Sequence, residues 1–212
     1  MDPMLIAIIA GTVVVIVGVY FLASKLSDST ITKMTTYSAK LAQKMGLPAP
    51  TAQSSKASAF YVSEIKGLVD EREFSFIQFT RSQKRAGTYV SEFTWACNRD
   101  VTPRIIISKE GMFSPLSKQL GVTDIIVGDA EFDNTFIIQC DDPNYAKKAL
   151  NDRVRKEILR WQRHWHGTLV IHHNEVHYEE TGVIVDEMDF DRFIRLIDLG
   201  KFIAEALETL AD

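Results

Sequence analysis

The stretch T-Y-V-S-E-F-T-W-A-C, residues 88–97, decides how this chain folds. Phe93 and Trp95 share one parity along it, whereas Glu92 and Thr94 share the other. A repeat of two residues places successive side chains on opposite faces of a β-strand, so one face is apolar and the other polar. The stretch therefore predicts a half-buried strand in an antiparallel sheet.

Similar runs lie on both sides of this strand, and short groups of turn residues separate them. They are rich in β-branched and aromatic residues, which is typical of strands. We therefore expect an antiparallel meander. The further expected strands cover residues 60–68, 73–80, 104–109, 124–127 and 132–140.

Helix signals dominate the last third of the chain. Residues 142–150 begin with a capping Asp followed by Pro, and residues 151–165 begin with Asn-Asp, so each predicts a helix. A hairpin is expected over residues 168–179, and a long helix with an apolar stripe over residues 189–210. This order predicts an α+β fold with one antiparallel sheet and packed helices, not a doubly wound parallel sheet.

The composition excludes several classes of protein. Hydrophobic residues make up 46% of the 212 residues and charged residues 25%, which excludes a disordered tail and a collagen-like fibre. Two cysteines without C-x-x-C spacing exclude a disulfide-stapled mini-protein and agree with a reducing compartment. A net charge of -4 lacks the basic excess typical of nucleic-acid binders, so we expect no nucleic-acid partner.

The first segment of the chain predicts a membrane anchor. Residues 4–23 read M-L-I-A-I-I-A-G-T-V-V-V-I-V-G-V-Y-F-L-A and contain no charge. A helix of about 20 residues spans the hydrocarbon core of a bilayer, which is about 30 Å thick. The alternative is a cleaved signal peptide, which needs a basic leader, whereas this leader is Met1-Asp2-Pro3. We therefore expect an uncleaved N-terminal transmembrane helix in contact with membrane lipid.

The residues that flank and line this segment predict its direction and its neighbours. No Lys or Arg precedes it, whereas four lysines follow it: Lys25, Lys33, Lys40 and Lys44. Basic flanks stay in the cytoplasm, so we expect a single-pass protein of the inner (cytoplasmic) cell membrane with a cytoplasmic C-terminal domain. Ala7, Gly11 and Gly18 lie near one helical face, where they would let two copies associate into a homo-oligomer.

The rest of the chain divides into a connecting region and a compact domain. Residues 29–46 carry apolar side chains at helical spacing and predict a juxtamembrane amphipathic helix. Residues 47–58, L-P-A-P-T-A-Q-S-S-K-A-S, lack periodicity and predict a linker. We therefore expect a transmembrane anchor over residues 1–24, this helix and linker over 25–58, and a soluble α+β domain over 59–212.

One pattern resembles a known group of proteins. Residues 128–136 read G-D-A-E-F-D-N-T-F, and Asp141-Asp142-Pro143, Ala146 and Leu150 follow. This succession resembles uncharacterised bacterial membrane-anchored proteins of unknown function, in which G-D-x-x-F-D-x-x-F precedes D-x-x-x-A-x-x-x-L. The resemblance covers about the last half of the chain. It implies a recurring structural domain and carries no established activity.

The acidic residues of this pattern do not match a calcium-binding loop. Asp129 and Asp133 offer oxygen ligands, but Asn134 stands where such a loop needs the glycine of its sharp turn. We expect instead a tight turn in which the carboxylates accept backbone N–H groups. Phe132 and Phe136 should then lie in the core.

The helices expected over residues 142–165 carry seven positive charges. Such a face is either solvated or in contact with anionic lipid or an acidic partner. The charges are those of Lys147, Lys148, Arg153, Arg155, Lys156, Arg160 and Arg163. The sequence contains no P-loop, G-x-G-x-x-G, G-x-S-x-G or H-E-x-x-H motif, so it names no catalytic residue and no cofactor-binding residue.

All five histidines lie between positions 164 and 177. If the expected hairpin turns at His173-Asn174, His172 lies opposite Glu175 and Val170 lies opposite His177. His172, Glu175 and His177 then share one face, and zinc or iron accepts these ligand types. The alternative is a polar outer face that binds no metal.

These observations favour a single-pass membrane protein whose cytoplasmic domain is a protein-interaction or scaffold module for an unidentified protein. One alternative is a metal-binding enzyme or sensor that uses the histidine-rich hairpin. The other is a domain that docks on anionic lipid. An interaction module predicts an apolar or aromatic surface patch without converging polar groups. An enzyme predicts a pocket with perturbed titratable residues, and a lipid-docking domain predicts a basic face turned toward the anchor.

Overall fold

The computed structural model describes residues 29–55, 60–83, 86–109 and 124–210. Residues 29–45 are helical. The elements that follow are β1 (Thr51–Ser55), β2 (Phe60–Val69), β3 (Arg72–Gln83), β4 (Ala86–Lys109), α2 (Ala130–Thr135), β5 (Phe136–Cys140), α3 (Pro143–Ala149), α4 (Asp152–Arg160), the short 3-10 helix η2 (Gln162–His164), β6 (Gly167–Thr181) and α5 (Glu187–Glu208). The expected anchor, residues 4–23, lies outside the described residues, and no helix within them is long and apolar enough to span a membrane.

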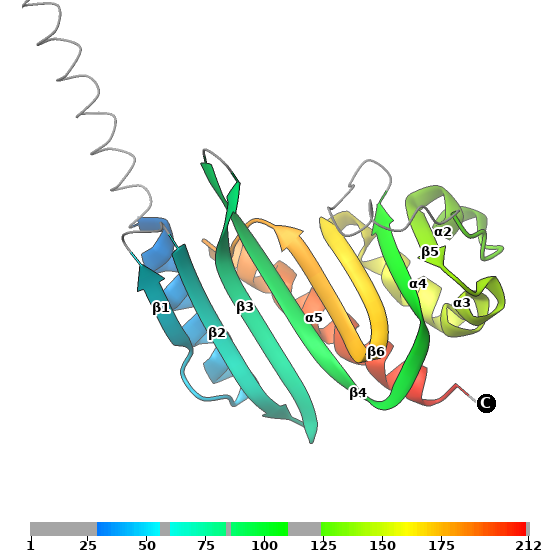
Figure 1. The fold of residues 1–212 in the computed structure, drawn as a ribbon, viewed down its shortest axis with the longest axis horizontal. Helices are drawn as coiled ribbons and strands as arrows, with labels where there is room; N and C mark the ends of the chain where they lie inside the picture. Colours follow the sequence, from blue (N-terminus) through cyan, green and yellow to red (C-terminus); the bar gives the residue numbers. More distant parts are fainter. Residues whose placement is uncertain (1–28, 56–59, 84–85, 110–123, 211–212) are drawn as a thin grey trace, which may run out of the picture.

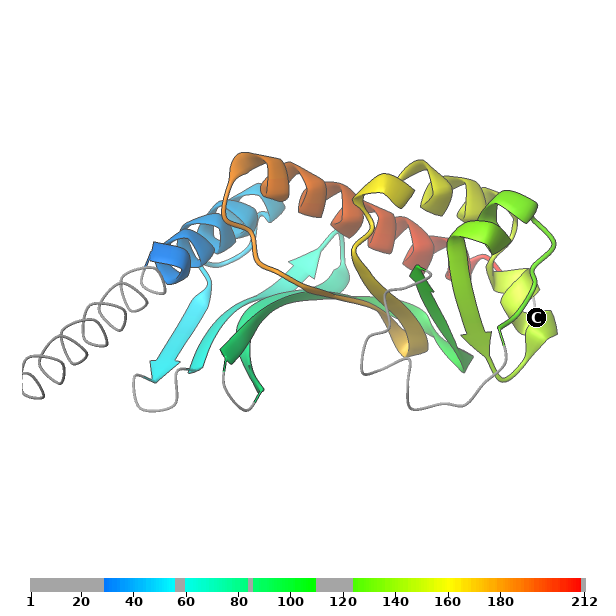
Figure 2. The same ribbon diagram turned by 90° about the horizontal axis from the view of Figure 1, so that it is seen from above.

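The described strands form one antiparallel sheet of six strands, with helices packed on it. Neighbouring strands follow the order β1-β2-β3-β4-β5, and β6 pairs with β4. The helix of residues 29–45, α4 and α5 lie on the same side of the curved sheet (Figures 1 and 2). The α+β class predicted from the sequence, with one antiparallel sheet and packed helices, is confirmed.

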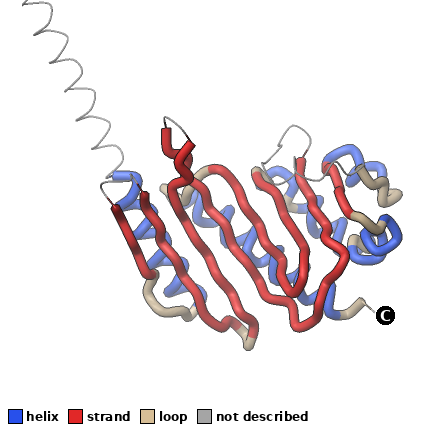
Figure 3. The backbone as a smooth tube through the Cα atoms, viewed as in Figure 1, coloured by secondary structure: helices blue, strands red, loops and turns tan. Residues whose placement is uncertain are grey.

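Both β4 and β6 double back on themselves, as Figure 3 shows. A Cβ added to Gly167 would collide with the backbone oxygen of Glu179 and lie 2.8 Å from the Cβ of Glu180. Gly167 lies at the start of β6, and Glu179 and Glu180 lie near its end. The start and the end of one straight strand could not be neighbours, so β6 is a hairpin. His173, with φ of 51°, lies at its turn, and the turn at His173-Asn174 predicted from the sequence is confirmed.

The longer β4 runs along both arms of this hairpin. Its first part pairs Phe93 with Tyr178, and its last part pairs Ile107 with Leu169. The register shifts twice between these parts, on either side of Val101, because the outer strand needs extra residues to pass around the hairpin turn. The two strands that we expected over residues 88–97 and 104–109 are therefore two arms of one bent strand.

The core lies between the sheet and α5. Gly200 allows α5 to approach β4 closely, since a Cβ at this position would lie 2.5 Å from Cε2 of Phe93 and 3.1 Å from Cδ1 of Trp95. The indole Nε1–H of Trp95 donates to the backbone oxygen of Ile197 at 2.9 Å. The apolar stripe predicted for this helix faces the sheet, but the helix begins one turn earlier than expected, with Asp186 as its N-cap.

The helix of residues 29–45 contributes to the same core. Met34 and Leu41 are fully buried, and the hydroxyl of Ser38 donates to the side chain of Gln78 at 3.3 Å. Residues 51–55, which we expected in a linker, form β1 on the edge of β2. Their sequence shows no apolar alternation, so only the pairing with a neighbouring strand makes them a strand.

Two further predictions about the middle of the chain are wrong. Residues 124–127 form a loop in which Ile125 and Val127 are buried. The loop bonds to β5 through the N–H of Ile125 and the side chain of Asp124. Residues 132–140 do not form one strand, because α2 occupies residues 130–135 before β5 begins. The capping side chain of Asp129 makes the helix more favourable here than an extended chain.

Candidate functional site

The sheet has one face that carries no described helix, which we call the open face (Figure 2). Alternation along β4 places Phe93 and Trp95 in the core and Glu92 and Thr94 on the open face. In β6, the same alternation places Tyr178 in the core and the neighbouring residues 177 and 179 on the open face. The polar positions of residues 88–97, Glu92 and Thr94, therefore line the open face.

Glu92, His177 and Glu179 come together in the middle of the open face. Glu92 lies directly opposite Glu179 in the pairing of β4 with β6, and Thr94 lies directly opposite His177. One ligand atom from each of the three residues lies within 4.8 Å of the others. Among the residues that the structure describes, this is the only group of three or more His, Cys, Asp or Glu side chains with such spacing.

Two neighbours hold members of this cluster in position. Arg81 from β3 donates to both carboxylate oxygens of Glu179, at 2.9 and 2.8 Å. The hydroxyl of Thr94 lies 3.1 Å from Nδ1 of His177, which leaves Nε2 of the imidazole for another partner. Glu92 has no hydrogen-bond partner among the described residues. The cluster thus holds two oriented side chains and one carboxylate without a donor.

Burial perturbs the titration of this cluster. Burial raises the pKa of Glu92, and the negative charge of Glu179 raises it further, although Arg81 opposes this effect. Burial lowers the pKa of His177 below its ordinary value, so the imidazole is neutral at pH 7. A neutral imidazole beside two carboxylates can accept a cation or a proton. This combination of perturbed groups is typical of functional sites and is also found in structural ion-pair networks.

The predicted ligand set was His172, Glu175 and His177. The hairpin places all three on its outer face, as expected, but His177 meets Glu92 and Glu179 rather than the other two. Glu175 is exposed and His172 is partly exposed, near the hairpin turn. Glu92 and Glu179 were not predicted as neighbours of His177, because their proximity depends on the register between β4 and β6.

The G-D-x-x-F-D-x-x-F stretch forms the tight turn that we predicted. The carboxylate of Asp133 accepts three backbone N–H groups, from Val127 at 2.9 Å, Gly128 at 3.0 Å and Asp129 at 3.1 Å. Gly128 has a positive φ of 91°, a conformation that favours glycine. The stretch therefore makes a corner between the loop and α2.

The two phenylalanines of this stretch are core residues, as predicted. Phe132 and Phe136 are 0% and 2% exposed, and their ring centroids lie 5.1 Å apart. Phe136 also packs edge-on against Trp165, with centroids 5.2 Å apart. The apolar positions of the pattern thus connect the corner to the core.

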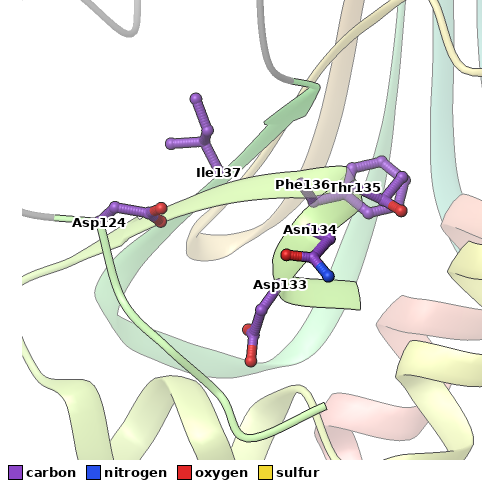
Figure 4. Close-up of a pocket in the computed structure, with 6 residues that line it drawn as sticks. All are labelled: Asp124, Asp133, Asn134, Thr135, Phe136 and Ile137. Atoms are coloured by element: carbon purple, nitrogen blue, oxygen red, sulfur yellow. The ribbon is translucent and has the colours of Figure 1, made fainter. Parts of the chain in front are cut away.

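A small polar pocket opens beside this corner (Figure 4). The carboxylate of Asp124 on its wall accepts the N–H of Ile138 at 2.8 Å, and that of Asp133 is engaged as described above. Both acids therefore stabilise backbone, which favours a structural role for this pocket. The residues that line it are Asp124, Asp133, Asn134, Thr135, Phe136 and Ile137.

The basic helices have several internal partners. Arg155 is largely buried and donates to Asp129 at 3.4 Å, while Arg153 and Arg160 stack on the rings of Phe202 and Trp161. Arg155 is nevertheless the only one of the seven basic residues that is not exposed. Contact with anionic lipid stays a prediction.

No family model matches this chain, and no curated protein matches it.

Proposed function

We propose that this chain is a single-pass membrane protein whose cytoplasmic domain is a protein-interaction module that binds a second copy of itself. Residues 4–23 form the anchor in this proposal, and the edge strand β1 forms the contact. The observation that carries the proposal is a difference between the two edges of the sheet.

The edge at β5 is closed by the chain itself. The N–H of Ile125 donates to the backbone oxygen of Ile138 at 2.8 Å, and the N–H of Ile138 donates to the side chain of Asp124 at 2.8 Å. The outward backbone groups in the middle of this strand are therefore satisfied. A further strand therefore cannot pair with β5 at Ile138.

The edge at β1 differs. β1 pairs with β2 along Thr51–Ser55, and no described strand pairs with its other side. Its sequence, T-A-Q-S-S, has neither a charge nor a proline, the usual features that prevent an edge strand from pairing with another chain.

A second copy is the partner that this edge fits best. Two antiparallel β1 strands related by a two-fold axis would present the same uncharged surface to each other, without like-charge repulsion. A shared membrane would keep the two copies at high effective concentration, so a short pairing segment would suffice. The small residues Ala7, Gly11 and Gly18 of the anchor would support the same association.

Cysteine cross-linking in membranes tests this proposal. Single cysteines at Ala52, Gln53 and Ser54 scan the centre of β1, where a two-fold axis brings equivalent residues together. The native Cys97 and Cys140 are buried, and burial raises the pKa of both thiols, that of Cys97 to about 11, so they should not react. Met188→Cys, at a site that is 77% exposed and outside the edge, is the matched control.

We expect oxidation to give a disulfide-linked homodimer for at least one β1 position and not for Met188→Cys. Adding Thr51→Lys to that variant should reduce the dimer, because a charged edge strand resists pairing. Equal cross-linking at Met188→Cys, no dimer at any β1 position, or cross-linking only to a different protein would contradict the proposal.

A further inference from the structure

We propose that Glu92, His177 and Glu179 bind one divalent transition-metal ion on the open face of the sheet. The site lies in the middle of the sheet and is independent of the β1 edge, so it goes beyond the proposed self-association. Each ligand atom already lies within 4.8 Å of the other two.

The spacing suits a small cation. In a tetrahedral zinc site with bonds of about 2.0–2.1 Å, neighbouring ligand atoms lie about 3.3 Å apart. Side-chain rotations that close each gap by at most about 1.5 Å would therefore complete the coordination. Glu92 and Glu179 start from directly opposite positions on paired strands, so the backbone already brings the two carboxylates together.

Two ligands have the supporting contacts that metal ligands usually have. The imidazole of His177 is held through Nδ1 by Thr94, at 3.1 Å, so Nε2 can bind the ion. Arg81 holds Glu179 through both oxygens, but a carboxylate has about four lone-pair sites and can accept an ion as well. Arg81 and Thr94 would then orient the ligands from the second coordination sphere.

Polar groups without partners mark the same face. Glu92 is partly buried opposite another carboxylate and receives no hydrogen bond from the described residues. The hydroxyl of Thr168, a residue that is 1% exposed, also has no partner among them. Alternation along the hairpin places Thr168 on the open face, in the arm beside Glu179. Buried polar groups of this kind need an ion, a water molecule or another ligand to satisfy them.

The ligand types select the class of ion. One imidazole nitrogen with two carboxylate oxygens favours ions such as Zn²⁺, Fe²⁺ or Mn²⁺ over Mg²⁺ and Ca²⁺, which prefer oxygen ligands alone. We use Zn²⁺ as the probe because it has no redox chemistry, and Mg²⁺ as the comparison ion.

Calorimetric titration of the purified full chain in detergent tests the site. The affinity tag must contain no histidine. We expect one equivalent of Zn²⁺ to bind with a dissociation constant of about 10 μM or tighter, and we expect excess Mg²⁺ not to displace it. Glu92→Gln and His177→Gln should each weaken binding at least about tenfold, and Thr94→Val should weaken it about tenfold through the lost support.

The double variant His172→Ala, His173→Ala is the matched control, since it removes two histidines at the hairpin turn and spares the three ligands. It should bind Zn²⁺ like the unchanged chain. Melting curves show whether each variant is folded, and the nearly isosteric Glu92→Gln decides the question if His177→Gln unfolds. Binding weaker than about 100 μM, binding that survives Glu92→Gln unchanged, or binding that the control abolishes would overturn the proposal.

Discussion

Replacing Asp133 by Ala tests whether the G-D-x-x-F-D-x-x-F corner holds this part of the fold together. The substitution removes the acceptor for the N–H groups of Val127, Gly128 and Asp129. The corner connects the loop before α2 to Phe132 in the core, so its loss should reduce the stability of the whole domain.

The expected magnitude follows from the burial of the three donors. The hydrogen bonds from Val127 and Asp129 are partly buried, whereas the one from Gly128 is exposed, so water can replace the acceptor only there. A hydrogen bond to a charged group contributes about 1.5–3 kcal/mol, and partial exposure favours the low end. Counting the two partly buried bonds, we expect Asp133→Ala to lower the free energy of unfolding by about 2–4 kcal/mol. Asp133→Asn keeps one uncharged acceptor oxygen and should cost about half as much.

Thermal unfolding of the full chain in detergent, followed by tryptophan fluorescence, measures this effect. All three tryptophans, Trp95, Trp161 and Trp165, lie in the described domain. For a chain of this size, about 2–4 kcal/mol corresponds to a decrease in Tm of about 5–15 °C. Asp141→Ala is the control, because Asp141 is exposed and should change the stability by less than about 0.5 kcal/mol. A loss below about 1 kcal/mol for Asp133→Ala would show that the corner does not stabilise the fold.

Three further predictions concern the first helix, the topology and an ion pair. Leu41→Ala should lower the free energy of unfolding by about 2–5 kcal/mol, measured by the same fluorescence melt, because Leu41 is fully buried; no loss would mean that the helix of residues 29–45 is dispensable. A cysteine added at the C-terminus should react with an impermeant label only after the cells are opened, and labelling of intact cells would reverse the assigned orientation. Hydrogen bonds from Arg72 hold the pKa of Glu208 below its ordinary value, so the ion pair stabilises the fold above that value, and this contribution is lost as the pH falls through the folded-state pKa. Stability should therefore decrease more steeply below about pH 4.5 in the unchanged chain than in Glu208→Gln, and parallel pH profiles of Tm would refute this.

Local signals predicted the local elements of this fold. Asp142 followed by Pro143 gave the start of α3, because the side chain caps the Asn144 and Tyr145 N–H groups and proline needs no hydrogen bond there. Period-two alternation gave the faces of β4, and the apolar residues on either side of His173 gave the hairpin. Each of these features is set by residues that are neighbours in the sequence.

Features that depend on distant pairing were not predicted. β1 is a strand only because β2 lies beside it, and its own residues show no strand pattern. Glu92 and Glu179 are opposite each other because of the register between β4 and β6. A shift of one residue in this register would place the two side chains on opposite faces of the sheet. The place of His177 on the outer face of the hairpin was therefore predictable from the sequence, whereas its neighbours on β4 were not.

Structural roles alone explain the pattern of residues 128–136. Gly128 adopts a positive φ, the carboxylate of Asp129 caps α2, the carboxylate of Asp133 gathers three N–H groups, and Phe132 and Phe136 fill the core. Every fixed position of the pattern thus has a structural task, and neither carboxylate is left free for chemistry. Chains that carry the pattern should share its corner, whereas shared metal binding would require equivalents of Glu92, His177 and Glu179 on the open face.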